Sequence, residues 1–150
     1  MTSGDRAGEF GRISVPALQR IRTLWLELEP LVETTAFDNV IAPTELQVVL
    51  SAGINAAETA RLDIQWSEHR MYSFHYVDAT GLNWRFDRHP TTHSPEKQFH
   101  PPPTASTDGA VSSCIEVEEV SLVTRAVHTM WRVAYDQADT ELLNSATNPP

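Results

Sequence analysis

The segment that most constrains the fold is a pair of alternating runs, 71–77 and 82–87, joined by Asp78-Ala-Thr-Gly81. Aromatic side chains recur at every second residue with polar residues between them, which predicts two β-strands that each bury one face. The connection decides which residues pair, because a shift of one residue would exchange the buried and exposed faces of a strand. The segment therefore predicts an antiparallel hairpin with one aromatic face and one polar face.

Two loop lengths fit this connection. A two-residue loop (79–80) would set His75 opposite Trp84, whereas a three-residue loop (79–81) places Gly81 where a left-handed residue follows a type I turn. The three-residue register pairs Tyr76 with Trp84, Phe74 with Phe86, His75 with Arg85, and Ser73 with Asp87. We expect this register because it places the aromatic pairs on one face and the polar pairs on the other.

The aromatic stripe has two interpretations. An exposed stripe would suit base stacking on single-stranded nucleic acid. We expect a core face instead, because two amphipathic helices elsewhere in the chain need a sheet to cover. The stripe consists of Tyr72, Phe74, Tyr76, Trp84 and Phe86.

Helical spacing predicts one helix at each end of the domain. The first begins at an N-cap, Ser14, and ends before Pro30, and the second runs over 120–137. Further strands are predicted at 44–50 and 61–66, with a short one within 112–117. A loop rich in proline and histidine over 89–108 is expected to contain neither strand nor helix.

These elements predict one α+β domain over 14–138, in two layers: an antiparallel β-sheet meander flanked by an N-terminal and a C-terminal helix. Residues 1–13 are expected to be a disordered N-terminus and 139–150 a C-terminal tail. The three-residue register also predicts that the polar face of the hairpin and the segment from His89 to His100 come together.

The composition favours a cytoplasmic protein. The 150 residues contain no membrane-length apolar run and no signal-peptide pattern, and the single cysteine excludes an internal disulfide. The chain has twenty acidic residues, ten arginines and one lysine, so its net charge is −9. A lysine-poor acidic surface is typical of salt-adapted (halophilic) proteins, although an ordinary acidic protein is the alternative.

The segment from Arg61 to His100 differs from the rest of the chain. It holds five basic and five acidic residues, so it is formally neutral, and it contains five of the six histidines. Electrostatics would therefore allow a polyanion to approach here more readily than elsewhere.

Three interpretations of this segment compete. A metal site could use His89, His93 and His100, but the spacing of the first two crosses a Pro-Thr-Thr loop and defines no geometry. A metal-independent hydrolytic site could use histidines as acid and base with an arginine on a phosphate. A hydrogen-bonded cluster that pins the loop to the sheet is the structural alternative.

We select the hydrolytic interpretation, without a metal or another cofactor. RNA cleavage at the 2′-hydroxyl requires a base, an acid and a cation, with an aspartate to orient one histidine. The candidate catalytic residues are His75, Arg85, Asp87, His89, His93 and His100.

Three stretches of this sequence resemble the TumE-like toxin family: Tyr72-Ser-Phe-His-Tyr-Val-Asp-Ala-Thr-Gly81, Trp84-Arg-Phe-Asp-Arg-His-Pro90 with His93, and Phe99-His-Pro-Pro102. The family pattern is an aromatic strand ending in a His-Tyr-x-Asp-Ala-x-Gly turn, a strand with Arg-Tyr/Phe-Asp-x-x-Pro, and a histidine-rich segment. Two departures indicate a diverged member. The histidine pair is spaced as His89-Pro-Thr-Thr-His93, and the distal His-Lys-His is reduced to Phe99-His100-Pro101.

The resemblance implies a toxin of a type II toxin–antitoxin pair, with a helix-turn-helix antitoxin as its partner. RNA as the target is an inference from the residue types and not from the family. The alternative is a non-catalytic α+β interaction module that binds a partner protein or nucleic acid through the same surface.

Overall fold

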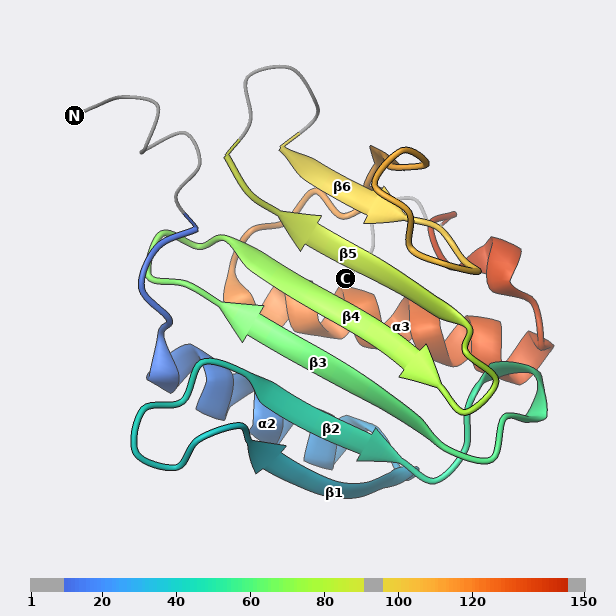
Figure 1. The fold of residues 1–150 in the computed structure, drawn as a ribbon, viewed down its shortest axis with the longest axis horizontal. Coiled ribbons are helices and arrows are strands. Elements are labelled where there is room, and N and C mark those ends of the chain that lie inside the picture. Colours follow the sequence, from blue (N-terminus) through green and yellow to red (C-terminus); the bar gives the residue numbers. More distant parts are fainter. Residues whose placement is uncertain (1–9, 91–95, 146–150) are drawn as a thin grey trace.

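The computed structural model describes residues 10–90 and 96–145, and Figure 1 shows the arrangement of their elements. In chain order these are helix α2 (Val15–Leu28), strands β1 (Val32–Phe37) and β2 (Leu46–Leu50), 3₁₀ helix η1 (Ile54–Ala56), strands β3 (Ala60–Trp66), β4 (Tyr72–Asp78), β5 (Asn83–Arg88), β6 (Lys97–His100) and β7 (Val111–Ser112), helix α3 (Val120–Gln137) and 3₁₀ helix η2 (Thr140–Leu142).

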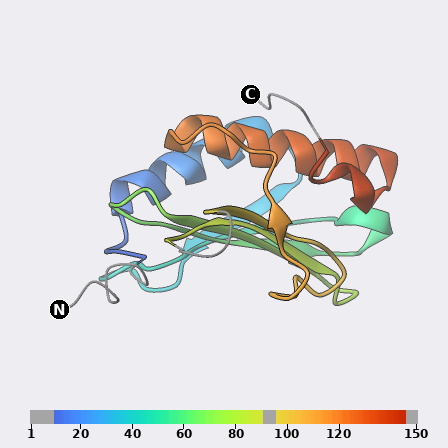
Figure 2. The same cartoon turned by 90° about the horizontal axis from the view of Figure 1, so that it is seen from above.

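The strands form one sheet in the order β1-β2-β3-β4-β5-β6-β7, and each strand is antiparallel to its neighbours. Both helices lie on the same side of this sheet, as Figure 2 shows, and they pack against each other. The predicted two-layer α+β fold with an antiparallel meander is therefore confirmed. On the opposite side of the sheet lies no helix of the described residues, and we call this side the open face.

The central hairpin adopts the predicted three-residue register. Tyr76 pairs with Trp84, and His75 pairs with Arg85. Gly81 has a φ of 90°, in the left-handed region that the turn requires. The aromatic side chains face the helices and are fully buried, so the core interpretation of the stripe is confirmed.

Core packing explains why the helices lie where they do. The Tyr76 and Trp84 rings stack with centroids 5.0 Å apart, and Trp25 of α2 meets Trp131 of α3 edge to face at 6.3 Å. Such ring pairs add about 0.5–1.5 kcal/mol each beyond the burial of their area. The N-cap is also confirmed: Ser14 Oγ accepts a hydrogen bond from the Ala17 amide at 3.2 Å.

The first and second helices are joined by a buried carboxylate. Glu29, the C-cap residue of α2, is fully buried and binds His128 and Arg132 of α3, each at 3.0 Å. The sixth histidine of the chain therefore belongs to the helix layer and not to the open face. Its role is to help hold α3 against α2.

Two sheet assignments from the sequence need correction. The expectation that 89–108 contains no strand is wrong, because Lys97–His100 form β6 and pair with β5. The prolines of this segment lie outside these four residues, so they do not interrupt the ladder. Strand β1 was not predicted, and of the short strand expected within 112–117 only Ser112 is in a strand, β7 (Val111–Ser112).

The ends of the domain also differ from expectation. Residues 1–9 of the expected disordered N-terminus lie outside the described residues. Ile13 bridges to Ser67, and the amide of Ser14 donates to the Trp66 carbonyl, so the chain is already paired with the sheet before α2 begins. At the other end, η2 follows α3 and Leu143 is fully buried in the core.

Candidate functional site

The open face carries the polar residues that the hairpin register predicted. Cross-strand pairing places Gln47, Asp63, His75, Arg85 and His100 in one row across β2 to β6. Paired residues of an antiparallel sheet share a face, so these side chains lie on the side away from the helices. We call residues 101–110 the 101–110 strap. Part of it lies on this side of the sheet in Figure 2, and its Thr104 bridges to Asn83 at the start of β5.

Arg85 is the cation at the centre of the site. Its Nε donates to Asp87 Oδ2 at 2.9 Å, and its Nη2 lies 3.3 Å from His100 Nε2. A guanidinium has five N–H groups, so two engaged groups leave three without a partner in the described part of the chain. The side chain is 29% exposed, and these free groups are therefore available to an anion.

His100 is held below the surface. Its Nδ1 lies 3.2 Å from the carbonyl oxygen of Ser106 in the 101–110 strap, and its side chain is only 2% exposed. A carbonyl oxygen can only accept, so Nδ1 carries the proton in this contact. Its Nε2 faces two charged groups, Arg85 Nη2 at 3.3 Å and Asp87 Oδ2 at 3.1 Å.

Asp87 connects the remaining residues. Its Oδ2 binds Arg85 and lies 3.1 Å from His100 Nε2. Its Oδ1 is buried, has no hydrogen-bond partner in the described residues, and lies 3.5 Å from His89 Nε2. That separation is too long for a hydrogen bond, so His89 approaches the carboxylate but does not satisfy it.

His75 and His89 are the accessible histidines of the site. His89 is 42% exposed, and His75 is half-buried with its Nε2 3.2 Å from Asn83 Oδ1. The sequence analysis missed Asn83, although the predicted period of two along 83, 85 and 87 places it on the polar face. His93 lies outside the described residues.

The predicted meeting of the polar hairpin face with the following segment is therefore confirmed for His89 and His100. The described residues contain no group of three histidine, cysteine or acidic side chains that could hold a metal ion. Within the same residues, no helix has the length and the apolar character needed to cross a membrane.

A second charged cluster lies at the end of β5 and β6. Arg88 pairs with Glu96 and Glu118, and Lys97 Nζ lies 2.8 Å from Glu118 Oε2. The hydrogen bond from Lys97, with the charge of Arg88, lowers the pKa of the Glu118 carboxyl below its usual value. This cluster ties the segment before α3 to the sheet, which is a structural role.

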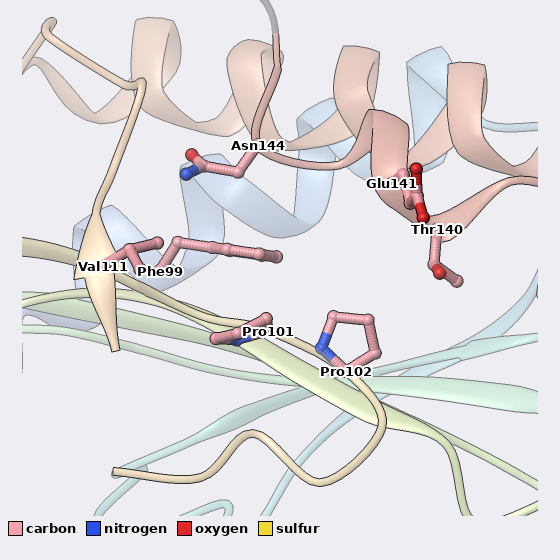
Figure 3. Close-up of a pocket in the computed structure, with 7 residues that line it drawn as sticks. All are labelled: Phe99, Pro101, Pro102, Val111, Thr140, Glu141 and Asn144. Carbon is pink, nitrogen blue, oxygen red and sulfur yellow. The ribbon is translucent and has the colours of Figure 1, made fainter. Parts of the chain in front are cut away.

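A pocket of about 480 Å³ lies near β6, β7 and η2 and is shown in Figure 3. It is lined by Phe99, Pro101, Pro102, Val111, Thr140, Glu141 and Asn144. None of the candidate catalytic residues lines it, and Glu141 is its one ionisable lining residue. The open face, and not this pocket, holds the candidate chemistry.

Comparison with known proteins places the chain in a family. The family model described as Toxin TumE matches residues 21–138, from the second turn of α2 through the C-cap of α3. The match therefore includes the whole hairpin and the polar cluster of the open face. No curated protein and no solved structure matches the chain. The chain belongs to the TumE toxin family, whose toxin–antitoxin character implies a cognate antitoxin as its partner.

Proposed function

We propose that this toxin cleaves RNA at the open face, where Arg85 binds the phosphate and exposed histidines exchange protons with the substrate. The observation that carries the proposal is the state of Arg85. One edge of its guanidinium is fixed by Asp87 and His100, while its other N–H groups remain free on an accessible surface.

The chemistry needs no metal. In RNA, the 2′-hydroxyl can attack the adjacent phosphorus once a base removes its proton, and the 5′-oxygen leaves once an acid supplies one. The negative charge that develops on the phosphate oxygens is stabilised by a fixed cation, which is the role proposed for Arg85. His75 and His89 are the described histidines of this site that a substrate can reach.

The buried members of the cluster take a different role in this proposal. Asp87 and His100 are positioning residues, because their side chains are 6% and 2% exposed and both contact Arg85. His93 remains a predicted catalytic residue. The cytoplasm as location and a helix-turn-helix antitoxin as partner remain proposals as well.

The test uses two arginines of the same face. Arg85→Lys keeps the positive charge but removes the fork of N–H groups, so we expect growth inhibition and RNA cleavage to fall at least about tenfold. Arg61→Lys is the matched control, because Arg61 is 46% exposed and paired with Asp63 on the same face. Growth after induced expression is measured with and without the antitoxin, together with cleavage of an RNA oligonucleotide.

Two further arms address the mechanism. An oligonucleotide with 2′-deoxyribose at the cleaved position should resist cleavage, and a chelator should not affect the reaction. Equal toxicity of the unchanged protein and Arg85→Lys would overturn the proposal. The non-catalytic interaction module would then be the better account of the open face, because the buried positions of Asp87 and His100 are also those of a purely structural cluster.

A further inference from the structure

We infer that Asn83, held by the 101–110 strap, sets the tautomer of His75, and that His75 thereby presents Nδ1 as the proton acceptor of the site. Asn83 is thus a positioning residue. The acceptor role rests on the proposed function, whereas the tautomer of His75 is independent of any activity.

The orientation of the Asn83 amide follows from its neighbours. Its Nδ2 lies 3.1 Å from the Gly81 carbonyl oxygen and 3.2 Å from the Pro103 carbonyl oxygen. Both partners can only accept, so the NH₂ group must face them; a reversed amide would place Oδ1 against two carbonyl oxygens. Oδ1 therefore points the other way, toward His75.

The tautomer of His75 follows from the amide. Its Nε2 lies 3.2 Å from Asn83 Oδ1, and an amide oxygen can only accept. Nε2 therefore carries a proton and donates it in this hydrogen bond. In the neutral ring Nδ1 then holds the lone pair, and Nδ1 has no partner in the described part of the chain.

The 101–110 strap supports both histidines at once. The Pro103 carbonyl accepts from the backbone amide of Asn83 at 2.8 Å as well as from its side chain, so Asn83 is fixed to the strap twice. Three residues further along the strap, the Ser106 carbonyl accepts from His100 Nδ1. One segment therefore fixes Asn83, the partner of His75 Nε2, and also contacts His100.

The chemical consequence is a defined first proton transfer. The 2′-hydroxyl proton passes to His75 Nδ1, the 2′-oxygen forms its bond to phosphorus, and the phosphorus–O5′ bond breaks. The leaving 5′-oxygen takes a proton from a protonated histidine, for which His89 is the accessible candidate, so the products are a 2′,3′-cyclic phosphate and a 5′-hydroxyl. Because Asn83 Oδ1 accepts from Nε2, the hydrogen bond also stabilises the ring once Nδ1 is protonated.

The experiment reads the ring nitrogens directly. The full chain is labelled with ¹⁵N-histidine, and His75→Gln identifies the His75 signals. At a pH where titration shows the ring to be neutral, we expect two well-separated ¹⁵N chemical shifts, one for a protonated Nε2 and one for an unprotonated Nδ1. Asn83→Ala should move both ¹⁵N chemical shifts toward their average, because the ring would then exchange between its two tautomers. Asn83→Asp keeps an acceptor for Nε2 and should preserve the separation, although it gives up the donors to Gly81 and Pro103.

The matched control is Asn39→Ala, because Asn39 also organises a turn through its side chain but lies in the loop between β1 and β2. It should leave the His75 signals unchanged. A protonated Nδ1 in the unchanged protein would overturn the inference without any variant, as would an unaltered His75 in folded Asn83→Ala. If the tautomer of His75 is found but RNA is not cleaved, the role of Asn83 in setting that tautomer is supported and the proposed function fails. The two results are therefore distinguishable.

Discussion

At the scale of single residues, the five candidates within the described residues divide by burial. The sequence predicted that Arg85, Asp87 and the histidines would share a face, because period-two alternation and the turn at Gly81 determine it. It could not predict that His100 and Asp87 lie below the surface, since burial depends on contacts made in the folded chain, such as that between His100 and Ser106 of the 101–110 strap. The strand register was enough to predict that the candidate side chains lie close together. Which of them a substrate can reach could be learned only from the tertiary structure.

This division predicts different costs of substitution. Asp87→Ala leaves Arg85 and the buried His100 without their carboxylate, and we expect a loss of about 2 kcal/mol in the free energy of unfolding. His75→Gln removes one hydrogen bond of a half-buried ring, and its cost should stay below about 1 kcal/mol. Urea unfolding of both variants checks this. Equal costs would show that His75 is as structural as Asp87.

At the scale of elements, the sequence predicted the helices and strands in which apolar residues recur at a regular spacing. Helix α3 matches its predicted bounds at both ends, because buried residues at helical spacing run along its whole length. Strand β1 was missed because it begins Val-Glu-Thr-Thr and forms an edge of the sheet, with exposed residues that give no clear alternation. Strand β6 was missed because four residues between proline-rich segments are too short for a period to be visible.

The central turn allows a sharp test at this scale. At Gly81 a Cβ would meet no atom within 4 Å, so the only cost of Gly81→Ala is the positive φ of 90°. We expect a loss of about 1–2 kcal/mol in the free energy of unfolding. Gly109→Ala is the control, because its nearest contact would be at 3.8 Å and its φ is not in the left-handed region. Its effect should be near zero, and similar losses at both glycines would contradict the turn assignment.

At the scale of the whole molecule, the two layers separate stability from the proposed chemistry. The helices bury the aromatic face and are joined through Glu29, while the open face carries Arg85 and its neighbours. The helix, sheet, helix order and the two layers could be predicted from hydrophobic periodicity, without β1 and β6. The path of the 101–110 strap could not, because it depends on single hydrogen bonds to Asn83 and His100 that no pattern encodes.

The net charge of −9 predicts how the whole molecule responds to salt. The segment 61–100 is neutral, so the excess carboxylates lie outside it and repel one another in the folded state. Raising KCl from about 0.1 M to about 2 M shortens the Debye length from about 10 Å to 3 Å or less, and we expect the unfolding midpoint to rise.

Salt also strengthens apolar burial in any protein, so the prediction needs a matched variant. Replacing four exposed glutamates by glutamine, at Glu27, Glu33, Glu58 and Glu116, changes the net charge from −9 to −5. None of the four forms an ion pair among the described residues, so the fold should persist. If repulsion between carboxylates limits stability at low salt, the variant is more stable there, and its midpoint rises less with KCl. The same rise in both proteins would mean that the salt response comes from apolar burial and that the acidic surface is not an adaptation to salt.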